Sequence, residues 1–154
     1  MPLAGIALGS NLGDRQSHLE AAIARLDRIL SGLLASSVFE TEPVDVLGAQ
    51  GRFLNAAVVG GFEGPPLDLL ATLLAIERER GRERPHAGAP RTLDLDLIFF
   101  GAEQVQEPGL VVPHPRFRER RFVLEPLAEI APDWRDPVTG LTVRELLLRL
   151  PPPA

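Results

Sequence analysis

Apolar runs of two different periods alternate along this chain, and their order limits the fold more than any other feature of the sequence. Short apolar runs that end at glycine or a polar residue are typical of buried strands, whereas apolar residues three and four positions apart are typical of amphipathic helices. The predicted elements are a strand over 3–8, a helix that starts after the N-cap Asp14 and ends at Gly32, strands over 33–40 and 53–62, a helix from Pro65 to Arg80, and a strand over 92–100.

This order, β-α-β-β-α-β, is the split βαβ pattern of ferredoxin-like α+β folds. It predicts a mainly antiparallel sheet with helices on both faces, in a three-layer α/β/α arrangement. Smaller elements follow: a short hairpin or loop over 101–108 before the apolar segment 110–112, and a segment over 118–130 that begins as a loop and becomes a helix interrupted by Pro126. A last short helix is opened by a capping box of Thr142 and Glu145. With 154 residues the chain has the length of one domain, so we expect a single domain over 1–150 and a proline-rich tail over 151–154.

The composition excludes several kinds of chemistry. The chain has no cysteine, and all 16 basic residues are arginine, so a thiolate nucleophile, a phosphate-loop lysine and a Schiff base are excluded. The formal net charge of −5 disfavours non-specific binding to nucleic acid. No signal peptide and no apolar run of membrane-spanning length is visible. We therefore expect a cytoplasmic monomer that binds neither nucleic acid nor a membrane.

The arginines are unevenly distributed. Five of them lie between Arg78 and Arg91, and four more lie between Arg116 and Arg121. Arginine is suited to bidentate contacts with phosphate or carboxylate groups. Solvated surface is the simpler explanation of a single arginine, but two dense clusters favour an anionic ligand.

The strongest local motif is the segment from Arg91 to Ile98, RTLDLDLI. Side chains alternate along a strand, so Asp94 and Asp96 share one face, about 6.5–7 Å apart, while the intervening leucines face the core. Two carboxylates at this spacing can hold a pair of Mg²⁺ ions, about 3.5–4 Å apart, or one ion. A half-buried strand with a solvated outer face is the alternative, but aspartate is depleted in strands.

Two weaker motifs accompany this strand. His114 lies between two prolines and is followed by the second arginine cluster, so its imidazole can donate to a phosphate oxygen. Phe53 and Asn55 share a strand face, where an aromatic ring beside an amide suits a flat heterocycle. Taken singly, a surface histidine and a core phenylalanine are the simpler interpretations.

Together these residues resemble the 6-hydroxymethyl-7,8-dihydropterin pyrophosphokinase family of folate biosynthesis. The resemblance extends over nearly the whole chain. Its segments are IALGSNLG at 6–13, FETEPV at 39–44, FLNAAV at 53–58, IE at 76–77, GR at 81–82, PRTLDLD at 90–96, VPHPR at 112–116, RRFVL at 120–124 and PLAEIAP at 126–132.

The resemblance implies transfer of a pyrophosphoryl group from ATP to the hydroxymethyl oxygen of the reduced pterin, with release of AMP. By position, it implies that Asp94 and Asp96 hold two Mg²⁺ ions and act in catalysis together with Arg82 and Arg91. The implied ATP contacts are Glu77, Arg82, Arg84, Arg91, His114 and Arg120. The implied pterin contacts are Thr41, Pro43, Val44, Phe53, Asn55 and Phe122, with Phe53 and Phe122 on the two faces of the ring.

Two other functions remain open at this point. A ferredoxin-like module that binds RNA or a nucleotide would present aromatic and basic residues on an open sheet, but here Asp94 and Asp96 lie where an RNA backbone would pass. A nucleotidyltransferase could use the same carboxylate pair with two metal ions, and it would release pyrophosphate instead of AMP.

Overall fold

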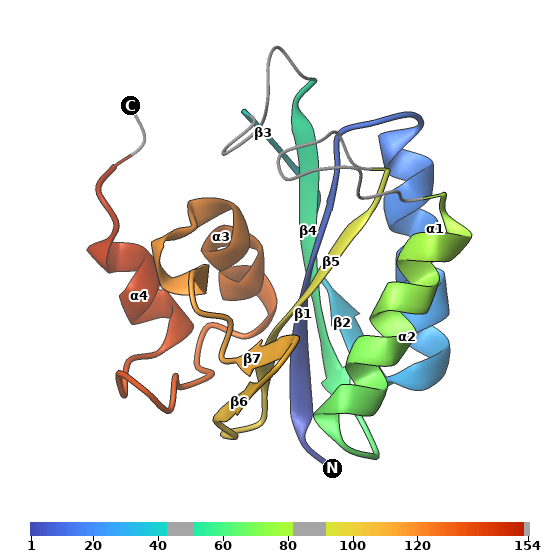
Figure 1. The fold of residues 1–154 in the computed structure, drawn as a ribbon. Coiled ribbons are helices and arrows are strands. Elements are labelled where there is room, and N and C mark those ends of the chain that lie inside the picture. The colour runs from blue at the N-terminus through green and yellow to red at the C-terminus, as the bar shows by residue number, and fades with distance from the viewer. Residues whose placement is uncertain (43–50, 82–91, 153–154) are drawn as a thin grey trace.

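The computed structural model describes residues 1–42, 51–81 and 92–152. Within these ranges the helices and strands follow the predicted order, with additional short elements near the C-terminus (Figure 1). The elements are β1 (Leu3–Ser10), α1 (Arg15–Ile29), β2 (Ser31–Ala35), β3 (Phe39–Thr41), β4 (Phe53–Gly61), α2 (Pro66–Glu79), β5 (Asp94–Phe100), β6 (Val105–Glu107), β7 (Leu110–Val112), the 3-10 helix η1 (Phe117–Glu119), α3 (Arg121–Ile130) and α4 (Val143–Arg149).

The described strands form a main antiparallel sheet in the order β2-β4-β1-β5, and β3 also pairs with β4. Helices α1 and α2 cover one face, and α3 and α4 cover the other (Figure 1). The small hairpin of β6 and β7 pairs separately. This arrangement confirms the predicted ferredoxin-like α+β fold with three layers.

Each face of the sheet has its own apolar core because side chains alternate along the strands. Ile6 and Leu8 of β1 pack toward α1 and α2, whereas Ala7 packs toward α3 and α4. On the α3 side, the ring of Phe99 stacks on Trp134 with 3.9 Å between centroids. Gly5 makes room for this ring, since a Cβ atom at position 5 would overlap Phe99.

The prediction for residues 30–40 was wrong in two details. Helix α1 ends at Ile29, and Gly32 lies in β2 with a φ of +62°, next to a shift in the pairing with β4. The predicted strand over 33–40 is two strands, because the regular pairing with β4 is interrupted between Ala35 and Phe39, where the Ser36 N–H still donates to the Ala57 carbonyl. In this break, the backbone N–H and hydroxyl of Ser37 donate to the carboxylate of Glu129 on α3.

The predicted helix starts were correct where a capping residue marks them. Asp14 accepts a hydrogen bond from the backbone N–H of Ser17, and Thr142 and Glu145 form the predicted capping box. Pro126 lies inside α3 without ending it, so the predicted interruption was wrong. In the described part of the chain, no helix combines the length and apolar character that crossing a membrane requires.

Candidate active site

One row of residues across three strands forms the centre of the candidate site. Gly9 of β1 pairs with Asn55 of β4 on one side and with Asp94 of β5 on the other. Paired residues face the same side of a sheet, so Asn55 and Asp94 stand about 9.5 Å apart with glycine between them. In the next row, Ala7 lies between Ala57 and Asp96. Gly9, Ala7 and Ala57 therefore form a low surface, the floor of the candidate site, on the sheet face that α3 covers. It lies between the Asn55 amide and the carboxylates of Asp94 and Asp96.

One wall of this floor comes from β3 and β4. Phe53 pairs with Thr41, and the amide nitrogen of Asn55 donates to the Thr41 hydroxyl at 2.5 Å. A Cβ atom at Gly9 would lie 3.3 Å from Asn55 Oδ1 and 3.6 Å from a Phe53 ring carbon, so both side chains border the floor. Both are buried. The predicted shared face of Phe53 and Asn55 is confirmed.

The opposite wall is formed by Asp94 and Asp96 of β5. Their side chains are half-buried, while Leu93, Leu95 and Leu97 are buried in the core under α1 and α2. The predicted alternation is confirmed, and it directs both carboxylates toward the face with Asn55. In the described ranges, no three histidine, aspartate or glutamate side chains gather closely enough to enclose a metal ion.

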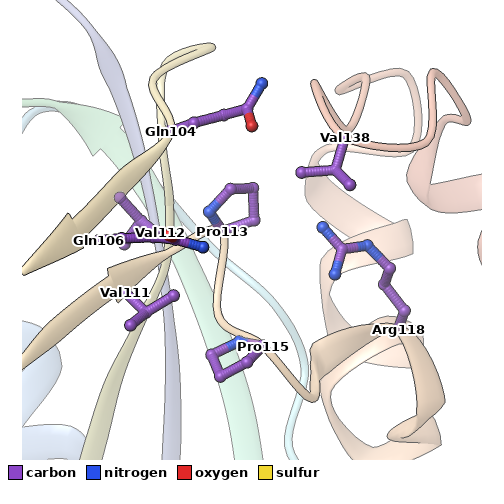
Figure 2. Close-up of a pocket in the computed structure, with 8 residues that line it drawn as sticks. All are labelled: Gln104, Gln106, Val111, Val112, Pro113, Pro115, Arg118 and Val138. Atoms are coloured by element: carbon purple, nitrogen blue, oxygen red, sulfur yellow. The ribbon is translucent and has the colours of Figure 1, made fainter.

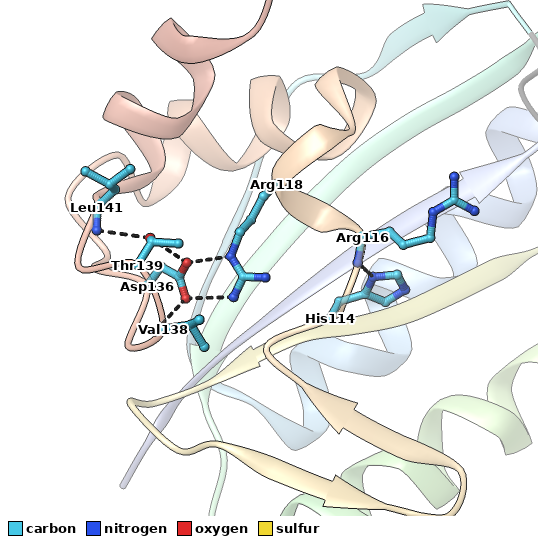
Figure 3. Close-up of polar contacts among 7 residues, drawn as sticks. All are labelled: His114, Arg116, Arg118, Asp136, Val138, Thr139 and Leu141. Atoms are coloured by element: carbon cyan, nitrogen blue, oxygen red, sulfur yellow. Dashed lines mark hydrogen bonds and ion pairs between the residues drawn. The ribbon is translucent and has the colours of Figure 1, made fainter.

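His114 is held at the end of β7 by backbone contacts. Its N–H donates to the carbonyl of Ile98 at 2.8 Å, and its Nδ1 accepts from the backbone N–H of Arg116 at 3.1 Å (Figure 3). Burial lowers the pKa of His114, and the charges of Arg120 and Arg116 lower it further against the opposing effect of Asp94. The neutral ring therefore carries its proton on Nε2, where it can donate.

Arg120 and Phe122 lie at the start of α3, and Phe122 packs against the apolar cluster that includes Ala7 and Ala57. The Arg120 guanidinium is 5.5 Å from the centroid of the Phe122 ring. Since Arg120 and Asp94 both act on the pKa of His114, the structure brings these three charged or titratable groups together. The predicted site thus combines a carboxylate, an imidazole and a guanidinium beside an aromatic ring.

Glu77 lies in a different environment from the one expected for a nucleotide contact. It is 2% exposed, on the buried face of α2, and its Oε2 accepts from the backbone N–H of Leu95 at 2.7 Å. This burial favours a role within the protein. The remaining predicted site residues, Pro43, Val44, Arg82, Arg84 and Arg91, lie outside the described residues.

A pocket of about 480 Å³ lies elsewhere on the molecule (Figure 2). It opens between the β6–β7 hairpin and the loop that carries Val138, and the Arg118 side chain forms part of its wall. None of the predicted site residues lines it. Its lining includes Pro113 and Pro115, the two prolines on either side of His114.

Arg118 points away from the candidate site and binds Asp136 in the C-terminal segment. Its Nε and a terminal nitrogen donate to the two carboxylate oxygens of Asp136 at 2.6 and 3.0 Å, and Asp136 is fully buried (Figure 3). Asp136 also accepts from the Thr139 hydroxyl and the Val138 backbone N–H. The second arginine cluster is therefore divided, with Arg118 structural and Arg120 beside His114.

Gly9, Ala7 and Ala57, which form the floor, were not among the site residues predicted from the sequence. The available signal was the run of small residues at alternate positions of two predicted strands, which leaves a sheet face without bulk. The sequence interpretation also missed the partner of Arg118, because Asp136 is 18 positions away and no local pattern connects them.

Comparison with known proteins shows which family has this arrangement. The family model described as 7,8-dihydro-6-hydroxymethylpterin-pyrophosphokinase matches residues 5–132. The chain belongs to this family. The match covers most of β1 and all of β4, β5 and α3, the elements that carry the site, and it confirms the resemblance noted from the sequence motifs.

Several family members resemble the chain over most of its length. A 2-amino-4-hydroxy-6-hydroxymethyldihydropteridine pyrophosphokinase of Bacillus subtilis is 45% identical over 130 residues, which are 83% of this chain and 77% of the relative. The enzyme of the same name from Synechocystis is 42% identical over 92% of this chain and 73% of its own. A crystal structure of Plasmodium falciparum HPPK-DHPS superimposes with a TM-score of 0.72 at 16% identity, over 97% of this chain and 43% of that longer chain, which supports the fold.

Proposed function

We propose that this pyrophosphokinase transfers a pyrophosphoryl group from ATP to the hydroxymethyl oxygen of 6-hydroxymethyl-7,8-dihydropterin, in folate biosynthesis. The products are the pterin diphosphate and AMP. The observation that carries the proposal is the row of Asn55, Gly9 and Asp94, which sets a heterocycle-binding amide and a carboxylate on either side of an open floor.

The pterin is proposed to lie on the floor beside β4. Phe53 and Phe122 supply the two aromatic faces, and Asn55 reads the ring edge with the Thr41 hydroxyl beside it. An amide offers both a donor and an acceptor, which matches the mixed edge of a pterin. Pro43 and Val44, outside the described residues, are proposed to complete the pocket.

The ATP phosphates are proposed to lie between β5 and the start of α3. Neutral His114 donates from Nε2, and Arg120 offers its guanidinium next to it. Arg82, Arg84 and Arg91 are proposed to add phosphate contacts, with Arg82 and Arg91 facing the charge that develops on the departing AMP. Positioning and charge neutralisation are what this transfer needs most from a protein.

The donor set of Asp94 and Asp96 fits Mg²⁺, which commonly binds through one or two carboxylates and completes its shell with water and substrate phosphates. The absence of a third acidic or histidine ligand among the described residues agrees with a metal that needs the nucleotide to complete its site. We propose two Mg²⁺ ions here, and when bound they would neutralise phosphate charge and favour deprotonation of the attacking alcohol.

In the proposed transfer, the pterin hydroxymethyl oxygen forms a bond to the β-phosphorus of ATP. The bond from that phosphorus to the oxygen of the α-phosphate breaks, and AMP leaves with this oxygen. Asp94 shares the row of Asn55, whereas Asp96 lies in the next row, so the Asp94 carboxylate is placed to accept the proton that the attacking hydroxyl loses. Phe53, Phe122 and the small floor exclude water, which would otherwise compete as an acceptor.

The test is incubation of the protein with ATP, Mg²⁺ and the reduced pterin, followed by chromatography of nucleotides and pterins. Equimolar AMP and pterin diphosphate are expected, and neither should form when magnesium is chelated. Release of pyrophosphate with a nucleotidyl product would show a nucleotidyltransferase instead. Absence of pterin-dependent AMP would refute the proposal.

A further inference from the structure

Strand β5 lies at the end of the strand order of the described sheet, so one of its edges has no neighbouring strand. In an antiparallel pair, alternate residues direct their N–H groups toward the partner strand and away from it. The N–H of Leu95 donates to a side chain on α2, so this residue belongs to the set that points away from β1. The amides of its neighbours, Asp94 and Asp96, therefore face β1.

The acceptor of this outward amide is Glu77. Its Oε2 lies 2.7 Å from the Leu95 nitrogen, and the side chain is only 2% exposed. A buried carboxylate is strongly unfavourable unless hydrogen bonds stabilise it, and hydrogen bonds to an ionised acceptor are about twice as strong as neutral ones. The contact therefore links α2 firmly to the edge of β5 that faces away from β1.

Leu95 stands between the two aspartates, so this link acts on the part of β5 that presents both carboxylates. We propose that Glu77 is a positioning residue, which fixes the backbone of β5 and thereby aims Asp94 and Asp96 at the floor. The inference rests on the proposed function, because it assumes that these carboxylates bind the metal. Ligand carboxylates depend on the shell that orients them, and loss of such a group typically weakens metal binding by about 10–100-fold.

The geometry also distinguishes this role from direct contact with the nucleotide. The Leu95 side chain is buried in the core under α1 and α2, while the aspartates face α3. Glu77 approaches β5 from α2, so the strand lies between its carboxylate and the floor. This arrangement supports an indirect effect of Glu77 on the two aspartates, through the backbone of β5.

Two substitutions at position 77 separate the hydrogen bond from the charge. Glu77→Gln keeps an oxygen that can accept from Leu95 and removes the charge. Glu77→Asp keeps the charge but is one methylene shorter, so the 2.7 Å contact opens. The matched control is Glu79→Gln, on the same helix, where the carboxylate is exposed and pairs with Arg25 at 2.7 Å.

The first measurement is Mn²⁺ binding in the presence of α,β-methylene-ATP, an analogue that cannot donate pyrophosphate. Glu77→Asp is expected to weaken Mn²⁺ binding by about 10–100-fold, and Glu77→Gln by less than about tenfold. Glu79→Gln should match the wild type. The opposite order, with Gln worse than Asp, would show that the charge itself acts on the ligand and would overturn the proposal.

The second measurement is hydrogen exchange at the Leu95 amide in a ¹⁵N-labelled protein. Exchange should accelerate in Glu77→Asp and remain slow in Glu77→Gln, with the amides between β1 and β4 unchanged in both. Faster exchange at Leu95 with wild-type Mn²⁺ affinity would overturn the proposal, and so would unchanged exchange. If Glu77→Asp fails to fold, Glu77→Gln alone decides. A loss of Mn²⁺ affinity of about tenfold or more in Glu77→Gln, with slow exchange kept at Leu95, would overturn the proposal.

These results are independent of turnover by the wild type. Failure of the wild type to form AMP would refute the proposed function, whereas the order of the variants in Mn²⁺ affinity and Leu95 exchange would still decide the role of Glu77.

Discussion

The ion pair between Arg118 and the buried Asp136 allows a quantitative prediction of stability. Replacing Arg118 with methionine keeps most of the apolar stem and removes the two hydrogen bonds to Asp136, at 2.6 and 3.0 Å. Asp136 is fully buried, so the variant leaves a carboxylate without its counter-charge. Breaking a buried pair in this way costs about 3–5 kcal/mol. The bonds from Thr139 and Val138 remain, so we expect about 3 kcal/mol.

The assay is urea and thermal unfolding followed by circular dichroism. For a chain of this length, about 3 kcal/mol corresponds to a melting temperature lower by about 6–12 °C. The control is Arg144→Met, which breaks an ion pair to Asp133 of similar length, 3.0 Å, whose side chains are 59% and 80% exposed. Such exposed pairs contribute about 0–1 kcal/mol. Equal losses in the two variants would refute the reasoning.

The pH dependence provides an independent check. Burial raises the pKa of Asp136, but the hydrogen bonds from Arg118, Thr139 and Val138 outweigh it and hold the pKa below its usual value. A lowered carboxyl pKa contributes stability above the unfolded-state value, about 3.9 for aspartate, and that contribution disappears as the pH falls through the folded-state pKa. The difference between wild type and Arg118→Met should therefore be full at neutral pH and shrink as acid protonates Asp136, first in the variant, which lacks the arginine charge, and then in the wild type.

Three further predictions concern the floor and its surroundings. Asp96→Ala should lower kcat/KM for AMP formation by about 10²–10³-fold at saturating Mg²⁺, and near-normal turnover would remove its metal role. Phe53→Ala should weaken pterin binding in calorimetry and leave ATP binding intact, so an equal loss for both ligands would contradict the pocket assignment. Gly5→Ala should destabilise the fold by about 1–3 kcal/mol in urea because its Cβ overlaps Phe99, whereas Gly51→Ala, with ordinary contacts, should not.

The order of elements and the faces of the strands could be predicted from the sequence because both depend on local periodicity. Leu93, Leu95 and Leu97 alternate with Asp94 and Asp96, so burial of the leucines determines where the carboxylates point. The break between β2 and β3 could not be predicted in this way. It depends on hydrogen bonds from Ser37 to a helix 92 positions away.

Helix α2 also shows how far local periodicity can predict which side chains are buried. Helical spacing predicts an inner face of Leu70, Leu73, Leu74 and Glu77. Leu73 and Glu77 are buried as predicted, but Leu74 is exposed, and Leu69 and Ile76 are buried as well. Helical spacing correctly placed Glu77 on the inner side. Its acceptor role depends on the edge of β5, which is a property of the sheet order and not of the helix pattern.

The low floor of Gly9, Ala7 and Ala57 has a consequence for ligand selectivity. A molecule that rests on it meets only backbone and methyl groups from below, so shape and thickness decide which compounds fit. An analogue with a substituent that projects perpendicular to its plane on that side would collide with the sheet, which cannot yield without breaking the register of β1 with both neighbours. Planarity is thus enforced by the central strand itself.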